Sequence, residues 1–352
     1  MSRQVPLRIV LLKPSKYAAD GYVERFRRGF MPNSTVSYLK SLTPAEVDGT
    51  PCEVFAFDEY VHTDLDYLSL LAPGADRRTL LALVGVQSHQ FHRALDLAAL
   101  ARSRGVENVV IGGPHAMTCE TTPLQGRGVS FALAEAEVIW LSILRDAIQG
   151  ALQPTYGADG RWWGERLDPP PLVPPSRRDL RRYAVRMLGV YPARGCPYTC
   201  NFCSVIKIAG RQVRSQPVDT TIASLKAAAA GGVRMVMFTS DNFNKYPDVG
   251  DLLAAMIEEK IRLPFFVQCD AQIVRQGFPY RCGTRGDGRR RYPGSDRGAP
   301  ARPSHVRGYR PRPPRPRRRL PPATPEPLWH RSRAAAAEPC ADGRGRRDQP
   351  PG

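Results

Sequence analysis

Three cysteines stand close together in the second half of the 352-residue chain, at Cys196, Cys200 and Cys203. Their C-x3-C-x2-C spacing lets three thiolates on one loop bind three different irons of a [4Fe-4S] cube, which leaves the fourth iron without a protein ligand. That iron is open to a substrate or a cofactor. The alternative is a structural zinc site, which needs four ligands, and the next cysteine, Cys269, comes only 66 positions later. The spacing therefore favours an iron–sulfur cluster.

The cysteine usage agrees with a reducing compartment. We expect neither a membrane span nor a secretory signal, because the chain has no run of about 18 apolar residues and MSRQVPLRIVLLKP lacks a small-residue cleavage site after a long apolar stretch. The expected location is cytoplasmic, where thiols stay free. The eight cysteines then indicate a metal or redox site before a disulfide framework.

The elements that must position the cysteines form a βα series. Strands are expected at 190–193, 233–239 and 263–268. Helical patterns over 218–229 and after Asp248, a capping residue, alternate with these strands. The order βαβαβ predicts a parallel sheet with the cysteines directly after its first strand.

The first 149 residues show a similar alternation of strands and helices. Helices are expected over 91–104 and 136–148. The expected strands are 7–12, 53–57, 80–86, 108–111 and 129–132. Five strands in this alternation predict a flavodoxin-like Rossmann-type domain, whose ligand should lie beyond the carboxyl ends of the strands.

Composition divides the chain into four parts. They are an α/β Rossmann-like domain at 1–149, a proline-rich linker at 150–186, three βα units at 187–276 and a tail at 277–352. Because proline locks φ, the linker should be a stiff connection. Its pair Trp162-Trp163 predicts either a lid or a small satellite core.

The net charge of +18 is concentrated in the tail. Residues 277–352 hold 19 Arg, no Lys and 6 acidic residues, or +13, and the first 276 residues carry the remaining +5. With few aliphatic side chains, the tail cannot bury enough apolar surface to fold, and we expect it to be disordered. Such an arm could bind nucleic acid or an anionic membrane. Few aromatic residues are interleaved with its arginines, however, so we expect neither partner.

The composition changes abruptly after Gln276. The following residues are rich in Arg, Pro, Gly and Ala, as translation of GC-rich DNA in a wrong frame would produce. Our hypothesis is a frameshift near codon 276, which the nucleotide sequence would test.

The cysteine segment RGCPYTCNFC resembles the signature of the radical S-adenosylmethionine (SAM) superfamily, with an aromatic residue before the last cysteine. The resemblance implies a partial (β/α)6 barrel, here truncated after three units, in which the unique iron chelates the amino and carboxylate groups of SAM. Thr239-Ser240-Asp241-Asn242 stands where the family has its motif for the SAM amino group. The implied SAM contacts are Phe202, Ser240, Asp241 and Asn242.

Two arginines after the cysteines, Arg211 and Arg214, resemble the basic residues that follow the cluster in this superfamily. They are equally well explained as residues of a solvated loop.

The first domain narrows the resemblance. Its segments VGVQSH, VVIGGPHAM and FALAEAE, joined by a proline-rich linker to the cysteine motif, resemble the cobalamin-binding branch of the superfamily. The pattern Asp-x-His-x-x-Gly, which supplies a histidine to cobalt in some other cobalamin proteins, is missing. Two glycines would let the backbone approach a flat macrocycle closely. The implied cobalamin contacts are Ser88, His89, Gly112, Gly113, Pro114 and His115.

The resemblance also implies a function. Most characterised members of this branch are methyltransferases in which cobalamin relays a methyl group from SAM, and a minority catalyse cyclisation or ring contraction. We expect methyl transfer to a carbon of a small molecule or peptide precursor, and an electron donor as partner if radical chemistry operates. The stretch 11–44 resembles enzymes that methylate C2 of tryptophan in thiopeptide biosynthesis, where SAM serves as a polar methyl donor. The alternative is a non-catalytic fragment that binds cobalamin and the cluster. No catalytic residue is assigned.

Overall fold

The computed structural model places most of the first 270 residues. Predictions about residues 271–352, including the prediction that the tail is disordered, lie outside the described residues. Among the residues it describes, no helix is both long and apolar enough to cross a membrane. The described residues are 5–63, 67–71, 74, 77–158, 163–164 and 167–270.

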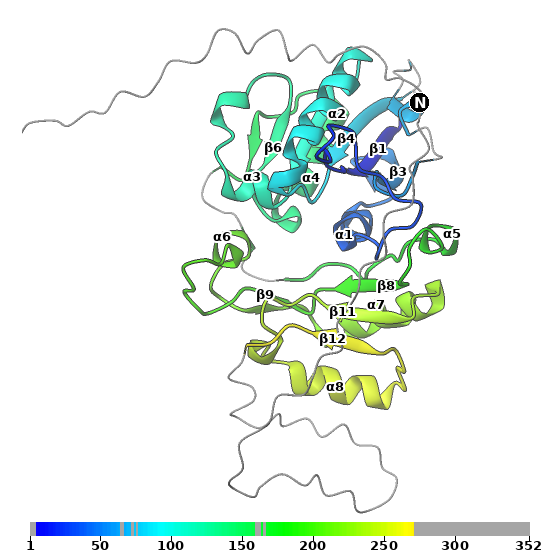
Figure 1. Ribbon diagram of the computed structural model, residues 1–352, viewed down its shortest axis with the longest axis vertical. Coiled ribbons are helices and arrows are strands. Elements are labelled where there is room, and N and C mark those ends of the chain that lie inside the picture. Colours follow the sequence, from blue (N-terminus) through cyan, green and yellow to red (C-terminus); the bar gives the residue numbers. More distant parts are fainter. Residues whose placement is uncertain are drawn as a thin grey trace, which may run out of the picture. The chain divides into compact units, whose positions relative to one another are not determined.

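A sheet of seven strands forms the N-terminal part (Figure 1). The strands are β1 Leu7–Lys13, β2 Glu46–Val47, β3 Thr50–Asp58, β4 Arg78–Leu83, β5 Asn108–Gly112, β6 Ser130–Ala132 and β7 Thr155–Tyr156. Their order is β2-β3-β1-β4-β5-β6-β7, and every pair is parallel except the β2–β3 hairpin. The five predicted strands therefore follow the flavodoxin-like order 2-1-3-4-5, as the alternation predicted.

Helices cover both faces of this sheet, so its central strand is buried on both sides. Val10 and Leu12 of β1 join one apolar cluster, and Ile9 and Leu11 join the other. A strand buried on both faces is a continuous apolar run, and this is why LRIVLL could be recognised in the sequence. The helices here are α1 Ser34–Leu42, η1 Ser69–Leu71, η2 Ser88–Gln90, α2 Phe91–Ser103, α3 Pro114–Thr118, η3 Thr122–Leu124 and α4 Ala136–Gln149.

The segment expected as a linker is packed against the rest of the chain. Thr155 and Tyr156 form β7 and pair with β6. Further on, Leu172 and Leu180 are buried in the apolar cluster of the C-terminal sheet. Trp163 lies against Gly210, since a Cβ on that glycine would meet its ring at 2.8 Å. Apolar side chains between the prolines thus fix this segment to both sheets.

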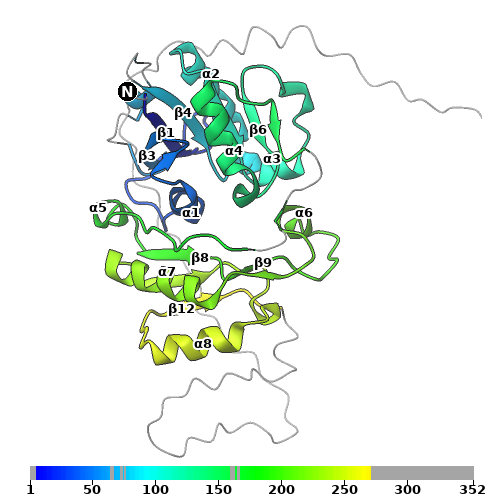
Figure 2. The ribbon, with the colours of Figure 1, turned by 180° about the vertical axis from the view of Figure 1, so that it is seen from behind.

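A second parallel sheet carries the βα series (Figure 2). Its order is β12-β11-β8, so the predicted parallel βαβαβ arrangement is confirmed. Helix α7 ends at Gly232 with φ of 94°, the left-handed conformation that glycine favours. The elements are α5 Arg177–Leu180, β8 Met187–Val190, β9 Ala193–Arg194, α6 Val205–Ile208, β10 Arg214–Ser215, α7 Val218–Gly231, β11 Met235–Phe238, η4 Phe243–Lys245, α8 Val249–Glu258 and β12 Phe265–Val267.

Two details of this series differ from the prediction. The first strand lies at Met187–Val190 rather than 190–193, because Ala193 and Arg194 leave the parallel sheet and pair antiparallel with β10. Asp248 occupies the position before α8, but its side chain accepts no hydrogen bond from the helix N-terminus. The predicted cap is therefore present in position only.

Helix α1, which the sequence did not predict, lies between the two sheets (Figures 1 and 2). Asn33 caps it by accepting hydrogen bonds from the backbone N–H groups of Thr35 and Val36. Leu39 packs into the cluster of the first sheet and Tyr38 into that of the second. The helix therefore joins the two apolar cores.

A close contact fixes α1 against β8. The backbone N–H of Gly189 donates to Ser34 Oγ at 3.0 Å. A Cβ at Gly189 would collide with that hydroxyl and lie 2.9 Å from Thr239 Cγ2. Glycine is therefore required at this position by packing.

We expect Gly189→Ala to destabilise the protein by about 1–3 kcal/mol, because the new methyl group overpacks this contact. Urea unfolding followed by circular dichroism measures the change. Gly250→Ala is the matched control: nothing lies within 4 Å of a Cβ there, in the first turn of α8. The free energy of unfolding of this control should be unchanged or higher by up to about 1 kcal/mol. Equal stability of the two variants would contradict the packing requirement for glycine at position 189.

Candidate functional site

The three cysteines lie on a loop, residues 195–213, whose ends are joined by the β9–β10 hairpin. Cys196 and Cys203 are half-buried, Cys200 is exposed, and none forms a disulfide. The backbone folds back on itself here, because the N–H of Cys203 donates to the carbonyl of Cys200 at 3.1 Å and that of Cys196 to Gly210 at 3.2 Å. Three free thiols are thus presented by one closed loop.

The loop does not form a site for a single metal ion. In the described part of the chain, no three His, Cys, Asp or Glu side chains converge on a point where one ion could be held. The preference for a [4Fe-4S] cluster over zinc therefore rests on the spacing of the three free cysteines in the chain.

Asp241, predicted to contact SAM, is bonded to the cysteine loop. Its Oδ2 accepts a hydrogen bond from the backbone N–H of Gly195 at 2.7 Å. Gly195 has φ of 97°, and a Cβ there would collide with the carbonyl oxygen of Gln212. Burial raises the pKa of Asp241 above its ordinary value, and the hydrogen bond from Gly195 opposes that rise. One carboxylate oxygen therefore holds the loop.

The other three residues predicted to contact SAM lie in different environments. The side chain of Phe202, on the loop, is 93% exposed. Ser240 is 1% exposed, and its Oγ has no hydrogen-bond partner among the described residues. Asn242 is bonded to Asp270: its Nδ2 donates to Oδ2 at 2.9 Å and its Oδ1 accepts from the backbone N–H at 3.1 Å. The structure brings Asp241 and the cysteine loop together, but it does not gather all four residues around one point.

The two arginines after the cysteines also differ. Arg211 is exposed. Arg214 is buried and forms a bidentate ion pair with Glu135, at 2.6 and 2.8 Å between nitrogen and oxygen atoms. Their side chains are only 3% and 5% exposed. The solvated-loop interpretation of Arg214 is therefore wrong: the residue joins the base of the cysteine loop to the N-terminus of α4.

A second arginine strengthens this connection. Arg194 is the direct β-pair partner of Arg214, and its Nη1 lies 2.9 Å from Glu137 Oε1. Its guanidinium lies between two aromatic rings, 4.8 Å from the centre of Tyr38 and 5.1 Å from that of Tyr191. The hydroxyl of Tyr38 donates to Glu137. We name Glu135, Glu137, Arg194 and Arg214 the ion cluster.

The sequence did not predict the ion cluster. Its glutamates lie in the segment FALAEAE, which was used only as a sign of family resemblance. Two glutamates at i and i+2 at the start of a helix were the available signal, but their partners lie 57 and 79 positions away.

A cavity of about 250 Å³ lies beside the ion cluster, at the carboxyl ends of β4, β5 and β6. Most of its wall is aliphatic or aromatic. Arg194 and Asp241 contribute polar groups from the cysteine-loop side. The predicted position of the ligand beyond the strand ends coincides with this cavity.

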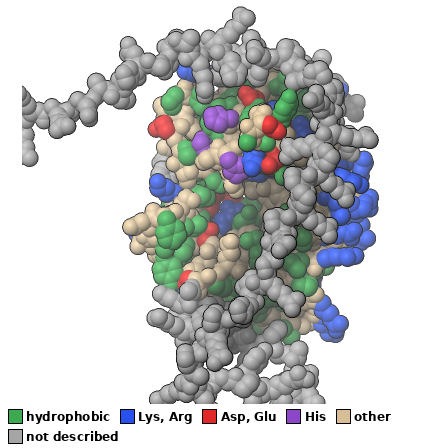
Figure 3. All heavy atoms as spheres, viewed as in Figure 1, with side chains coloured by type: hydrophobic (Ala, Val, Ile, Leu, Met, Phe, Trp, Pro, Cys, Tyr) green, Lys and Arg blue, Asp and Glu red, His purple; other side chains and the backbone are tan. Residues whose placement is uncertain are grey.

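The six residues predicted to contact cobalamin fall into two groups. Gly112, Gly113 and Pro114 line the cavity, whereas Ser88, His89 and His115 do not. Ser88 and His89 are exposed, and Figure 3 shows histidine side chains at the protein surface.

His115 is held outside the cavity by its neighbours. Its ring stacks on Phe91 with centroids 3.9 Å apart, and its Nδ1 lies 3.1 Å from Ser88 Oγ. Desolvation lowers the pKa of His115. His115 is therefore packed against its own domain, away from the cavity.

Packing gives a second reason, beside the predicted approach of a ligand, for glycine at position 113. Its φ is 130°, and a Cβ there would collide with the backbone of Val86 and lie 2.6 Å from the carbonyl carbon of Gly85. The close approach of the loop after β4 is therefore sufficient to require glycine at this position, whether or not a ligand binds. At Gly112, a Cβ would lie 3.1 Å from Ala132 Cβ.

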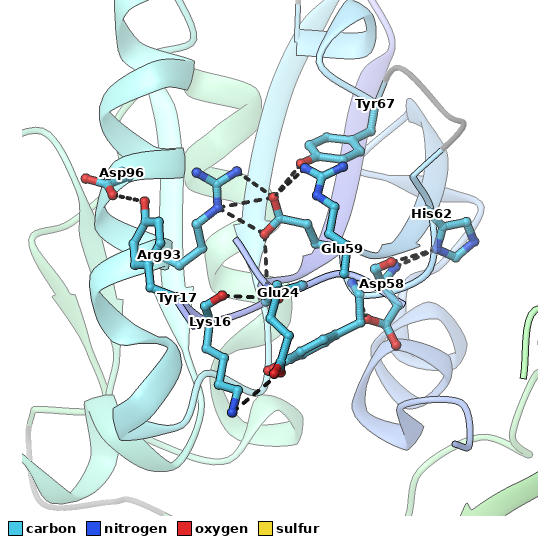
Figure 4. A network of polar contacts seen from close by, with 12 residues as sticks. Lys16, Tyr17, Glu24, Asp58, Glu59, His62, Tyr67, Arg93 and Asp96 are labelled. Atoms are coloured by element: carbon cyan, nitrogen blue, oxygen red, sulfur yellow. Dashed lines mark hydrogen bonds and ion pairs between the residues drawn. The ribbon is translucent and has the colours of Figure 1, made fainter. Parts of the chain in front are cut away.

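A separate polar network fills the carboxyl ends of β1 and β3 (Figure 4). Glu59 is fully buried and accepts hydrogen bonds from Arg93, with distances of 2.5 to 3.1 Å. Tyr67 Oη donates to Glu59 at 2.8 Å and the backbone N–H of Ser15 at 3.0 Å. These contacts keep the pKa of Glu59 below its ordinary value although burial opposes them. The network fixes the loop after β1.

Lys13 closes the crevice between β1 and β4. It is buried and donates to the carbonyl of Gly85 and to Gln90 Oε1, the latter at 2.6 Å. Burial lowers the pKa of Lys13 to about 8. In flavodoxin-like sheets this crevice is the usual ligand position. Here it is filled by protein, so the open space lies further along the sheet.

Comparison with known protein families identifies the C-terminal part. Residues 190–281 match the radical SAM superfamily. The chain carries a radical SAM domain. Radical SAM domains hold a [4Fe-4S] cluster and bind SAM, and the cysteine loop and Asp241 both lie within the matched residues.

Known proteins similar to this chain include methyltransferases. It is 26% identical to the bacteriochlorophyllide d C-8(2)-methyltransferase of Chlorobaculum tepidum, over 51% of this chain and 37% of that protein. It is 35% identical to the ribosomal protein uS12 methylthiotransferase RimO of a Synechococcus species, over 28% of this chain and 22% of that protein. The chain thus spans about a third or less of these relatives.

The fold is that of the solved radical SAM methyltransferase TsrM from Kitasatospora setae. One TsrM structure, with cobalamin and a [4Fe-4S] cluster bound, matches with a TM-score of 0.53 and 16% identity over 74% of this chain and 53% of that one. Another, with tryptophan and a SAM analogue bound, matches with a TM-score of 0.52 and 16% identity over 72% and 51%. The chain spans about half of TsrM.

We expect Arg214→Met to destabilise the protein by about 3–5 kcal/mol, because it removes the bidentate partner of the buried Glu135 and leaves it only Arg194, at 3.4 Å. Thermal and urea unfolding measure the loss. The double variant Arg214→Met/Glu135→Gln should recover part of it. Arg145→Met is the matched control, since its pair with Asp48 is exposed, and it should cost at most about 1 kcal/mol. An equal loss of unfolding free energy in Arg214→Met and Arg145→Met would contradict a larger contribution of the buried pair to stability.

Proposed function

We propose that this chain is a cobalamin-dependent radical SAM methyltransferase that acts on a carbon of a small molecule or peptide precursor. The supporting observation is the cavity, which has the Rossmann-type strand ends on one side and the base of the cysteine loop on the other. When bound, cobalamin would relay a methyl group from SAM. C2 of tryptophan is the substrate position that we propose, on the strength of the TsrM fold and of the resemblance in residues 11–44.

The cysteine loop fits the cluster and SAM. Cys196, Cys200 and Cys203 would hold three irons, and all three thiols are free. Asp241 uses Oδ2 to hold Gly195. Its other carboxylate oxygen could accept a hydrogen bond from the ammonium group of SAM, an interaction strengthened by charge. Asp241 would therefore both fix the loop and orient the methyl donor.

The cavity fits one part of cobalamin. Its wall combines Gly112, Gly113 and Pro114 with apolar side chains such as Trp140 and Ile143. Its volume, about 250 Å³, is below the roughly 300–1,000 Å³ of pockets for drug-sized ligands. An apolar portion of the cofactor would enter the cavity, and the larger remainder would lie outside it.

A non-catalytic protein that binds the cluster and cobalamin is the second proposal. The observation in its favour is that the chain spans only about half of TsrM. Methyl transfer from SAM to tryptophan, measured by mass spectrometry on the fully reconstituted chain, separates the two proposals. Retention of both cofactors without transfer to tryptophan or related indoles would favour the non-catalytic function.

The cysteine assignment predicts the outcome of anaerobic reconstitution with iron and sulfide. We expect about four irons per chain in the wild-type protein, and loss of most of this iron and of the charge-transfer absorbance in Cys200→Ala. Cys52→Ala is the matched control, because Cys52 is a free thiol on β3, outside the loop. Equal iron content in both variants would contradict the assignment.

The cavity assignment predicts the effect of filling it. Ala136 lines the cavity, so Ala136→Phe should lower cobalamin retention on gel filtration at least tenfold while leaving the iron content unchanged. Ala229→Phe, at an exposed position of α7, is the control and should retain cobalamin. Unchanged retention in Ala136→Phe would mean that cobalamin does not enter this cavity.

A further inference from the structure

Lys245, in η4 after β11, connects the cysteine loop with the end of β12. Its Nζ lies 5.6 Å from the centre of the Tyr198 ring, and Tyr198 is two positions from Cys196. On another side, Nζ lies 4.0 Å from Asp270 Oδ2. The lysine side chain is 25% exposed. An ammonium group thus lies over an aromatic residue of the loop that carries the cysteines.

Asp270, which faces this ammonium group, is itself fixed. Its backbone N–H donates to Asn242 Oδ1 at 3.1 Å and to Asn244 Oδ1 at 3.2 Å. Its Oδ2 accepts from Asn242 Nδ2 at 2.9 Å. These bonds join the loop after β11 to the residues after β12. The lysine is therefore held between two fixed elements.

Two arginines at the base of the loop are neutralised within the ion cluster, and two further cations of the loop, Lys207 and Arg211, are exposed. Arg194 and Arg214 pair with Glu137 and Glu135 at 2.9 and 2.6 Å. Lys245 has one carboxylate, at the limit of an ion pair. A hydrogen bond with Tyr198 raises the pKa of Lys245, so it is charged at neutral pH.

We propose that Lys245 is a positioning residue of the iron–sulfur site, which holds Tyr198 and places a positive charge beside the cluster. This inference rests on the proposed function, because it requires the cysteines to bind the cluster. One-electron reduction adds a negative charge to the cluster, and a nearby cation stabilises that state. Lys245 therefore raises the midpoint potential.

The test is a potentiometric titration of the reconstituted full-length chain, with dithionite as reductant and the EPR signal of the reduced cluster as readout. We expect Lys245→Gln to shift the midpoint potential to more negative values and to change the EPR line shape. Lys245→Arg keeps the charge and should restore most of the wild-type potential. Lys226→Gln is the matched control, because Lys226 pairs with Glu259 between α7 and α8, and it should leave the potential unchanged.

The outcomes distinguish this inference from the function on which it rests. If Lys245→Gln takes up a full cluster and titrates like Lys226→Gln, the inference is overturned and the proposed function stands. If Lys245→Arg shifts as far as Lys245→Gln, charge is not the cause and the inference is also overturned. A wild-type chain that takes up no cluster would overturn both.

Discussion

The arrangement of the site depends on the buried ion pair between Glu135 and Arg214. Neither group can be left alone in the interior, because an unpaired buried charge costs several kcal/mol. Glu135 precedes α4 of the first sheet, and Arg214 closes the cysteine loop of the second. The bidentate geometry fixes direction as well as distance. The position of the cysteine loop relative to the strand ends of the Rossmann-type domain is therefore an electrostatic requirement, which α1 supports by packing against both cores.

Other buried polar groups determine where open space remains in the first sheet. Lys13 and Gln90 fill the crevice between β1 and β4, and Glu59 with Arg93 fills the adjoining strand ends. Protein groups thus take up the usual ligand position of a flavodoxin-like sheet. Beside the ion cluster, small residues at the ends of β5 and β6 leave a cavity that faces Arg194. The space for a ligand and the base of the cysteine loop consequently share one wall.

The sequence predicted most of the sheets and the cysteine loop, because buried parallel strands are continuous apolar runs and the cysteines are adjacent in the chain. It could not predict pairs such as Arg214 with Glu135, 79 positions apart, since charge alone does not specify a partner. Helix α1 was missed because Tyr38 and Leu39 face different cores, so no single apolar stripe is present. The packing requirement at Gly113 could not be predicted, because backbone crowding and ligand approach both select glycine.

The structure also separates residues that hold the loop from residues suited to chemistry. Gly195 and Arg214 use their hydrogen-bonding groups on Asp241 and Glu135, while the three thiols carry no disulfide. A loop that was ordered only by its cluster would lose its shape whenever the metal was absent. Here protein contacts hold the base of the loop, through Gly195 with Asp241 and Arg214 with Glu135, and none of these contacts involves a thiol. Ordering a loop costs conformational entropy. A base that the protein already holds lowers the part of this cost that metal binding must offset. Cluster assembly then depends mainly on the nine-residue segment from Gly195 to Cys203.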